Sequence, residues 1–323
     1  MSELPGAITH TCQHCGHRFA AEPMAQHRIM CGDSREPGDM AALLAGEKAQ
    51  GVLTSPPYAE QRQQQYGGVP ADAYVAWWEA LQANVRAHLQ DDGSFFVNIK
   101  PHCEEGERVL YVMDLVLAMK RQWGWRFVDE FCWRHAGYPG GWPNRFKNGF
   151  EPVYHFSLAE QIKFRPEALL MESPYAEQNA KRIRARRPTD RKFHKGWRCR
   201  TGSGFGDMHG FTEEQAQLVR PDNVVEVHVS QLREGHPASF PVGLVEFFLK
   251  AFSDPGDLWL DPFLGSGTVT IATEQLGRRS CGMELLPAYV EVAILRWMKL
   301  TGRPALLAGT GKTYEEVRHE RTD

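Results

Sequence analysis

The sequence predicts an α/β protein with a mainly parallel sheet, an insertion in its second half and a small N-terminal module. Short apolar segments of strand length alternate with amphipathic segments of helix length, which is the pattern of βαβ units. The alternation stops between about 136 and 222, where the chain is first rich in Gly and Pro and then strongly basic. The first 31 residues are rich in Cys and His and show little apolar periodicity.

In the first half of the chain, helical spacing of apolar residues predicts helices and short apolar runs predict strands. Asp72 can cap one helix, and Asp91-Asp92-Gly93 is expected to end it. The expected order is helix 37–47, strand 51–54, helix 72–90, strand 94–100, helix 108–122, strand 125–133 and strand 151–157.

In the second half, regular spacing returns after the basic stretch. Gly277 stops one helix, and Pro287 starts the next because proline suits the first helical turn. The last dozen residues are mostly charged and are expected to be loosely held. The expected order is helix 240–252, strand 257–261, helix 268–276, strand 280–285 and a helix from Pro287.

Composition excludes several classes of protein. No run approaches the roughly 18 apolar residues of a membrane span, and the N-terminus has no basic-then-apolar signal pattern. Neither a membrane protein nor a secreted one is expected, so the predicted compartment is the cytoplasm. Seven cysteines, an odd number, argue against a disulfide framework and for thiols or metal ligands.

The first informative stretch is GVLTSPPYAEQR, residues 51–62. A short apolar run stops at Ser55-Pro56-Pro57-Tyr58, where two prolines forbid helix and remove two backbone donors. A serine and a tyrosine are therefore held on an unusually stiff turn. Read alone, this stretch is also compatible with a rigid strand exit.

The second informative stretch is LWLDPFLGSGTVTIATEQLGRRSCGMEL, residues 258–285. One strand ends in Asp261, a Gly-Ser-Gly turn opens a helix, and a second strand ends in Glu284, as in nucleotide sites of doubly wound sheets. The turn has two glycines, whereas the dinucleotide-binding fingerprint has three. The carboxylate of Asp261 precedes the turn, where it would repel a pyrophosphate. Asp261 suits an ammonium group and Glu284 a ribose, so the expected ligand is S-adenosylmethionine. An ordinary glycine turn is the alternative.

TSPPY at 54–58 together with DPFLGSGT at 261–268 resembles the amino-group DNA methyltransferases. The resemblance covers most of 33–300. It includes CGDS (31–34), HPASFP (236–241) and GMEL (282–285). The catalytic turn precedes the cofactor loop, which resembles the permuted β class of this family. The implied fold is a doubly wound, Rossmann-like sheet of seven strands, mostly parallel with an antiparallel edge hairpin.

The resemblance implies a role for each residue of the stiff turn. The Ser55 side chain and the Pro56 carbonyl accept the hydrogens of an exocyclic amino group, Pro57 helps to fix the turn, and Tyr58 stacks on the base. The base must leave the duplex to reach such a pocket. Transfer is direct, with catalysis from positioning. The cofactor residues expected by resemblance are Asp33, Thr54, His236, Pro237, Phe240, Asp261, Phe263, Gly265, Ser266, Gly267, Thr268, Glu284 and Leu285.

The base is expected to be cytosine, modified at N4, because Ser at the first position of the motif goes most often with that base in the family. Adenine N6 is the alternative. The Pro-Cys dipeptide of ring-carbon cytosine methyltransferases is absent from the sequence. The same chemistry on RNA and a non-catalytic DNA-binding relative are the rival functions, and the two intact motifs count against the second.

The N-terminal segment resembles C2HC zinc fingers. Cys12, Cys15, His27 and Cys31 follow the spacing C-x2-C-x11-H-x3-C, which can close a tetrahedral structural zinc site. Because Cys31 also begins the CGDS motif, the alternative is that His27 and Cys31 are strand residues of the methyltransferase.

The basic stretch between Lys181 and Arg200 holds ten Lys or Arg and one Asp, although the net charge of the whole chain is only −3. Such a run favours contact with the phosphates of double-stranded DNA, and a solvated charged face is the alternative. The permuted group often dimerises, but the sequence offers no interface for a homodimer. The residues expected at DNA are Arg182, Arg184, Arg186, Arg187, Lys192, Lys195 and Arg198.

These assignments give five segments. They are a zinc-finger-like module (1–32), the catalytic half of the methyltransferase domain (33–157), the inserted basic target recognition region (158–222), the cofactor-binding half (223–310) and a charged tail (311–323).

Overall fold

The computed structural model describes residues 8–11, 18–21, 26–60, 68–135, 144–178, 181, 217–227 and 240–322. The chain forms two compact units. The larger combines residues 1–165 with 223–323, and the smaller covers 166–222, within the predicted insertion.

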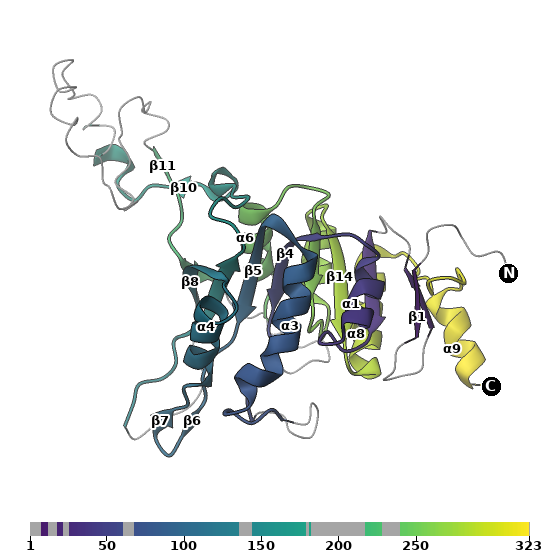
Figure 1. The fold of residues 1–323 in the computed structure, drawn as a ribbon. Helices are drawn as coiled ribbons and strands as arrows, with labels where there is room; N and C mark the ends of the chain where they lie inside the picture. Colours follow the sequence, from purple (N-terminus) through teal and green to yellow (C-terminus); the bar gives the residue numbers. More distant parts are fainter. Residues whose placement is uncertain are drawn as a thin grey trace. The chain divides into compact units, whose positions relative to one another are not determined.

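An eight-stranded sheet is the centre of the larger unit (Figure 1). In spatial order its strands are β12 (Val224–Glu226), β8 (Arg126–Arg134), β9 (Phe150–Ser157), β5 (Leu89–Asn98), β4 (Ala49–Thr54), β13 (Leu258–Asp261), β14 (Arg279–Glu284) and β3 (His27–Cys31). β9 is antiparallel to β5 and β8, and the other neighbours are parallel. The mostly parallel sheet is thus confirmed. It has one strand more than expected, because β12 adds to β8 and the antiparallel pair β8–β9 is no longer at the edge.

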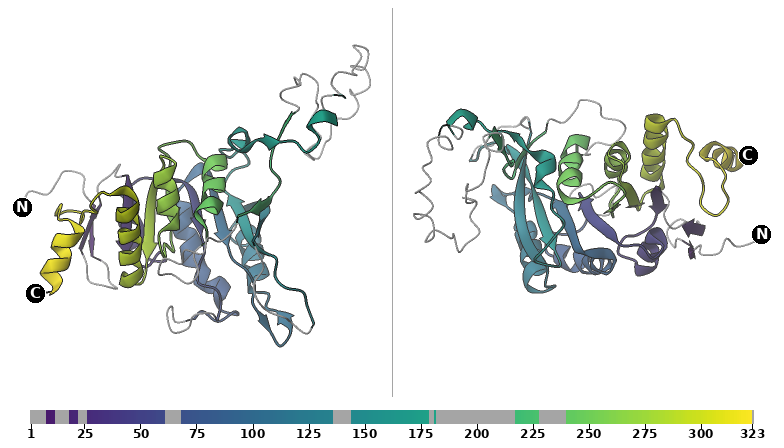
Figure 2. Two further views of the ribbon diagram at one scale, coloured as in Figure 1. Left: turned by 180° about the vertical axis from the view of Figure 1, so that it is seen from behind. Right: turned by 90° about the horizontal axis from the view of Figure 1, so that it is seen from above.

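Helices cover both faces of this sheet, so the sheet is doubly wound. Seen from above, α1, α3 and α4 lie on one face and α6, α7 and α8 on the other (Figure 2). Their bounds are α1 (Pro37–Leu44), α3 (Tyr74–His88), α4 (Tyr111–Arg121), α6 (Val242–Phe252), α7 (Thr268–Gln275) and α8 (Pro287–Thr301).

Burial on both faces explains the composition of the central strands. β4 is buried along its whole length, as is usual for a parallel strand between two helical layers. Gly51 lies against the Trp259 ring, and a Cβ at Gly51 would come within 2.7 Å of that ring. A glycine therefore lets two neighbouring central strands accommodate a fully buried tryptophan.

The direction of the chain connections reverses between β4 and β13. From β4 the chain continues through α3 to β5 on one side, whereas from β13 it continues through α7 to β14 on the other. Ligands of doubly wound sheets bind at such a switch point, outside the carboxyl ends of the strands. The two motifs singled out in the sequence end β4 and β13.

Some elements differ from the expectation. α3 ends at His88, and Asp91 and Asp92 already lie in β5, because Leu89 pairs with Ala49 before the register shifts. The charged end of the chain forms helix α9 (Tyr314–Thr322) instead of a loose tail. Thr313 and Glu316 form a reciprocal capping box, with the Thr313 N–H 2.7 Å from Glu316 Oε2.

Short strand pairs complete the described chain. β1 (Ile8–Thr11) pairs with β2 (Arg18–Ala21), and β6 (Cys103–Glu104) pairs with β7 (Glu107–Arg108), both antiparallel. In the smaller unit a 3-10 helix η1 (Pro166–Leu169) precedes β10 (Met171–Glu172), which pairs with β11 (Leu218–Val219). Among the described residues, no helix has the length and apolar character needed to cross a membrane.

Candidate active site

Four predicted residues lie at or just after the carboxyl ends of four neighbouring parallel strands. Ser55 follows β4, Asp261 ends β13, Glu284 ends β14, and Asp33 comes two residues after β3. Since these strands are adjacent and parallel, their carboxyl ends form one edge of the sheet, called the reactive edge below. The structure therefore brings the Ser55–Tyr58 turn and the predicted cofactor residues to the same edge, although Ser55 and Asp261 are more than 200 residues apart.

A direct bond joins the two motifs. The Thr54 hydroxyl donates to Asp261 Oδ1 at 2.8 Å, and both side chains are buried. The Phe263 N–H donates to the same oxygen at 3.1 Å. The pKa of Asp261 is raised to about 7, mainly by burial and also by the nearby Glu284, although the bonds from Thr54 and Phe263 act against the shift. A cationic ligand group beside Asp261 would favour the ionised carboxylate.

Glu284 holds the glycine loop, residues 263–267, through backbone bonds. Its Oε2 accepts from the Gly265 N–H at 2.9 Å, and its Oε1 accepts from the Leu286 N–H at 3.0 Å. The residue is 3% exposed, and burial raises its pKa. Each carboxylate oxygen has a second lone pair, so ligand hydroxyl groups can still donate to it.

The glycine loop needs its glycines for two reasons. Gly265 and Gly267 have φ angles of 52° and 77°, in the left-handed region. A Cβ at Gly267 would also come within 2.9 Å of the Ala293 Cβ in α8. Arg296, which the sequence did not single out, donates from Nη1 to Ser266 Oγ at 3.2 Å and to Thr268 Oγ1 at 3.0 Å.

Aromatic rings and an ion pair border this loop. The half-buried Phe263 ring stacks on Trp77 of α3 at 5.7 Å between centroids. The Arg35 guanidinium lies 5.6 Å from the centroid of the Trp77 ring and pairs with the Asp33 carboxylate at 2.5 Å. Phe240, two residues before the start of α6, is buried at 9% exposure. Trp77 and Arg35 were missed in the sequence because their roles depend on contacts between separate elements.

The Ser55–Tyr58 turn is held by side chains from two helices. Tyr74 of α3 donates its hydroxyl hydrogen to the Pro57 carbonyl at 2.7 Å, and the hydroxyl of Tyr111 in α4 bonds to the backbone of Ala59. Burial raises the pKa of both tyrosines, so their hydroxyls stay protonated. Ser55 and Tyr58 are half-buried while Pro56 is buried.

Tyr58 also reaches a buried ion pair. Its hydroxyl donates to Glu151 Oε2 at 3.2 Å, and the Lys100 ammonium bonds to Glu151 Oε1. Glu151 is in β9 and Lys100 follows β5. Glu151 was not predicted as a site residue. The signal that could have indicated it is an acidic residue within the otherwise mostly apolar strand segment FEPVYHFS.

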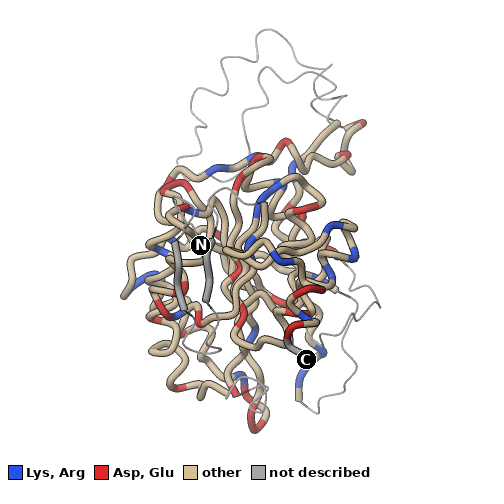
Figure 3. The backbone as a smooth tube through the Cα atoms, turned by 90° about the vertical axis from the view of Figure 1, so that its right-hand side faces the viewer, with Lys and Arg blue, Asp and Glu red and all other residues tan. Residues whose placement is uncertain are grey.

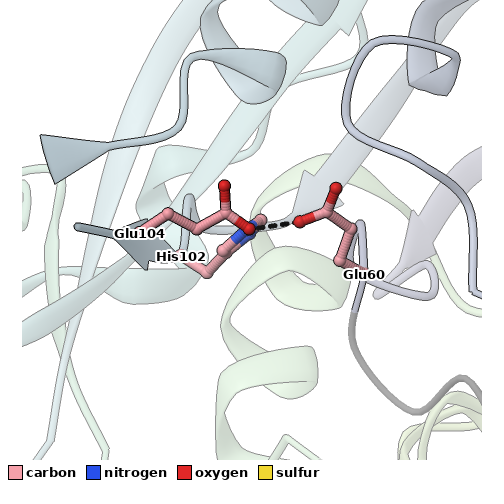
Figure 4. A group of neighbouring side chains, drawn as sticks. All are labelled: Glu60, His102 and Glu104. Atoms are coloured by element: carbon pink, nitrogen blue, oxygen red, sulfur yellow. Dashed lines mark hydrogen bonds and ion pairs between the residues drawn. The ribbon is translucent and has the colours of Figure 1, made fainter.

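A histidine and two glutamates follow the turn. His102 Nε2 lies 3.1 Å from Glu60 Oε2 and 3.3 Å from Glu104 Oε1 (Figure 4). The three potential ligand atoms are within 4.8 Å of one another. A metal on Nε2 would put the ring hydrogen on Nδ1, which is buried and faces no acceptor among the described residues. The geometry fits a histidine that donates to both carboxylates and ties the turn to the β6–β7 hairpin.

The zinc assignment of His27 and Cys31 is corrected by the structure. Both residues lie in β3, which pairs with β14 in the main sheet. His27 Nδ1 is 2.8 Å from Ser280 Oγ, and Nε2 is 2.8 Å from Glu274 Oε2, so both ring nitrogens have partners. Burial lowers the pKa of His27. The alternative, that these are strand residues of the main fold, is the one that holds. Cys12 and Cys15 lie outside the described residues.

Several predicted residues lie outside the part of the chain that the structure describes. They include His236 and Pro237, and the predicted DNA contacts Arg182, Arg184, Arg186, Arg187, Lys192, Lys195 and Arg198. Along the described backbone, basic and acidic residues are interspersed (Figure 3). The DNA-contacting surface therefore stays a prediction.

Comparison with known proteins agrees with this geometry. The model of the N6/N4 DNA methylase family matches residues 49–295. Type II methyltransferase M.PvuII of Proteus hauseri is 28% identical over 285 residues, covering 81% of this chain and 82% of that protein. M.ScaI of Streptomyces caespitosus is 24% identical over 251 residues, covering 76% and 73%.

Solved structures show the same fold. The PvuII DNA methyltransferase described as cytosine-N4-specific superposes with a TM-score of 0.60 at 22% identity, covering 86% of this chain and 90% of that one. TTHA0409 of Thermus thermophilus, solved with S-adenosyl-L-methionine, gives 0.53 at 21% identity, covering 88% and 100%. The predicted methyltransferase fold is thus confirmed. With most of its length matched, this chain belongs to the N6/N4 family of DNA methylases.

Proposed function

We propose that this protein transfers a methyl group from S-adenosylmethionine to N4 of a cytosine at a defined site in double-stranded DNA. The observation that carries the proposal is the Thr54–Asp261 hydrogen bond, 2.8 Å long. It joins the turn proposed to hold the base to the strand end proposed to hold the cofactor. The likeness to M.PvuII supports cytosine, and adenine N6 is the alternative.

The buried acids fit S-adenosylmethionine chemically. Asp261 is fully buried, with a pKa raised to about 7, and gains a counter-charge from the ammonium group of the ligand. Glu284 accepts from the ribose hydroxyls while its backbone bonds hold the glycine loop. When bound, the cofactor supplies an electrophilic methyl group on a sulfonium. The further cofactor residues proposed are Asp33, Thr54, His236, Pro237, Phe240, Phe263, Gly265, Ser266, Gly267, Thr268 and Leu285.

The stiff turn activates the amino nitrogen of the base. That nitrogen is a poor nucleophile because its lone pair is delocalised into the ring. The Ser55 side chain and the Pro56 carbonyl accept its hydrogens and draw it toward tetrahedral geometry, and Tyr58 stacks on the extruded base. The bond from Tyr74 to the Pro57 carbonyl and the bond from the Ala59 N–H to the Tyr111 hydroxyl keep the turn in place, so orientation is achieved before the reaction.

DNA recognition is assigned to the insertion. The compactness of residues 166–222 as a separate unit supports a target recognition region there, with the basic run at the phosphates.

The order of the motifs, with the turn before the glycine loop, supports the permuted β class. A homodimer is part of the proposal only by likeness to that class. We place the enzyme in the cytosol because seven cysteines suit a reducing compartment. Zinc is left out because His27 is engaged elsewhere.

Labelled methyl transfer tests the proposal. Purified protein is incubated with methyl-labelled S-adenosylmethionine and either duplex DNA or RNA, beside Ser55→Ala and Tyr58→Ala. We expect label in DNA only, a loss of about 100-fold or more in Ser55→Ala by analogy with loss of one polar group at a reacting centre, and DNA binding retained in both variants. Label in RNA would show that RNA is the substrate. Activity in Ser55→Ala equal to that of wild type would show that the turn has no role in the reaction.

A further inference from the structure

Glu151 lies where the antiparallel strand β9 meets the reactive edge of the sheet. β5 separates β9 from β4. Because β9 is antiparallel, its first residues lie beside the carboxyl end of β5, and Asn98 pairs with Val153. Glu151 is therefore presented at the same edge as the Ser55–Tyr58 turn, but from the opposite chain direction.

The Glu151 carboxylate is buried and has a cation beside it. The residue is 4% exposed. The Lys100 ammonium bonds to Oε1, and His135 Nε2 lies 3.8 Å from the same oxygen. A buried carboxylate is unfavourable unless it is paired. Lys100 supplies that pairing, so the other oxygen is a charged acceptor for Tyr58.

The Tyr58 hydroxyl donates to this acceptor. The bond to Glu151 Oε2 is 3.2 Å long, and hydrogen bonds to ionised acceptors are stronger than neutral ones. The hydroxyl oxygen lies on the long axis of the ring, so the bond fixes the direction in which the ring points. Rotation about that axis is restricted by packing, since Tyr58 lies against the main core. The ring is thus oriented by two different kinds of contact.

An account based on stability alone explains this arrangement poorly. A buried ion pair usually contributes little to stability compared with apolar side chains of similar volume. Here the pair lies at the reactive edge and is connected to a half-buried ring in the catalytic turn. A ring that is already fixed before its ligand binds loses little conformational entropy on binding, so binding is less costly.

We infer that Glu151, paired with Lys100, is a positioning residue that orients the Tyr58 ring for stacking on the extruded base. The inference rests on the proposed function and deepens it. Glu151 acts through Tyr58 and has no contact with the cofactor in this role. Its loss should therefore slow the reaction of the bound base without weakening the binding of S-adenosylmethionine.

A double-mutant cycle tests this role. Tyr58→Phe keeps the ring and the buried ion pair but removes the donated hydrogen. Glu151→Gln keeps the shape but removes the charge, and the double variant completes the cycle. Glu160→Gln is the matched control, because this glutamate follows the far end of β9 and its side chain is 85% exposed. The readouts are kcat and KM for duplex DNA, the affinity for S-adenosylmethionine and the melting temperature.

We expect Tyr58→Phe and Glu151→Gln each to lower kcat by about ten-fold or more, with affinity for S-adenosylmethionine within about two-fold of wild type. The double variant should be no slower than the slower single variant. Glu160→Gln should match wild type. Losses in kcat that multiply in the double variant would overturn the inference. So would full kcat in Tyr58→Phe, a variant that leaves the Lys100–Glu151 pair in place and does not depend on Glu151→Gln folding.

Failure of the proposed function would look different. If wild-type protein bound S-adenosylmethionine but transferred no methyl group to DNA, the proposed function would fall and the inference with it. If wild type were active and the cycle additive, only the role of Glu151 would fall.

Discussion

The turn after β4 and the loop after β13 meet at the Thr54–Asp261 bond, yet they are held in different ways. Side chains from other elements hold the first: Tyr74 bonds to Pro57, and Glu151 bonds to Tyr58. In the second, the loop backbone makes the bonds: its N–H groups donate to the carboxylates of Asp261 and Glu284, and two of its glycines adopt left-handed conformations. Substitutions in the loop should therefore affect folding and cofactor binding, whereas substitutions around the turn should affect the rate of reaction.

The largest effect is expected for Gly267→Ala. A left-handed φ is unfavourable for alanine by about 1–2 kcal/mol, and the new Cβ, 2.9 Å from the Ala293 Cβ, adds about 1–3 kcal/mol of overpacking. Gly277→Ala is the matched control, since Gly277 also has positive φ, 66°, but nothing lies within 4 Å of the added Cβ. Denaturant unfolding should show a clearly larger loss of the free energy of unfolding for Gly267→Ala. Equal losses would mean that the approach of α8 is unimportant.

The second effect is expected for Asp261→Asn. Removal of a charged acceptor should weaken the binding of S-adenosylmethionine by about 1.5–3 kcal/mol, which calorimetry would detect. The wild-type pKa of Asp261 is raised to about 7, so the carboxylate ionises, and affinity rises, as pH increases from about 6 to about 7.5. Above about pH 8 the ligand amino group loses its own charge. Asp261→Asn should lack the rise, and the same rise in both proteins would contradict the assignment.

The raised pKa also predicts how stability depends on pH. Folded Asp261 binds its proton more tightly than the unfolded chain, where the pKa is about 4. The free energy of unfolding of the ligand-free protein should therefore fall as pH rises from about 4 to about 7. Asp261→Asn should lose this part of the pH dependence. An unchanged slope would show that the carboxyl is not perturbed.

A smaller effect is expected for Thr54→Val, which removes the bond between the two motifs but keeps the side-chain shape. The bond from Thr54 lowers the pKa of Asp261, so its loss should raise that pKa and move the pH dependence of cofactor affinity to higher pH. The free energy of binding should weaken by about 0.5–1.5 kcal/mol. Thr54→Ser keeps the hydroxyl and should behave as wild type. If Thr54→Val kept the wild-type pH profile, the proposed effect of the Thr54 bond on Asp261 would be contradicted.

The smallest effect is expected for Tyr74→Phe. Pro57 loses one donor, but this residue is half-exposed, so water can replace part of the bond. We expect a loss of about 0.5–1.5 kcal/mol in the free energy of unfolding and a lower kcat, with cofactor affinity unchanged. Tyr314→Phe, the same change at an exposed tyrosine bonded to Glu291, is the control. Loss of cofactor affinity in Tyr74→Phe would contradict the expectation that substitutions around the turn affect the rate and not cofactor binding.

The fold and the two motifs could be predicted from the sequence because their signals are local. Ser55–Tyr58 and Asp261–Gly267 each end a recognisable strand, and parallel strands bring their carboxyl ends to one edge. The same reasoning failed for His27 and Cys31. Their spacing fits zinc, but tertiary pairing with β14 determines the contacts of His27.

The supporting contacts could not be predicted because they join separate elements. Tyr74 has the helical spacing of a core residue, and nothing in its neighbourhood shows that its hydroxyl reaches Pro57. Arg296 lies 28 residues from the hydroxyl group of Thr268 that it contacts. The capping box at Thr313–Glu316 was a local signal that could have predicted α9.

The most direct test of the central claim is mass spectrometry of nucleosides from the DNA of a methylation-free host that expresses this protein, with the Ser55→Ala variant beside it. We predict N4-methylcytosine with the wild type and none with the variant. N6-methyladenine would keep the mechanism and change the base, and the absence of both modified nucleosides, with the protein folded and binding S-adenosylmethionine, would contradict the account.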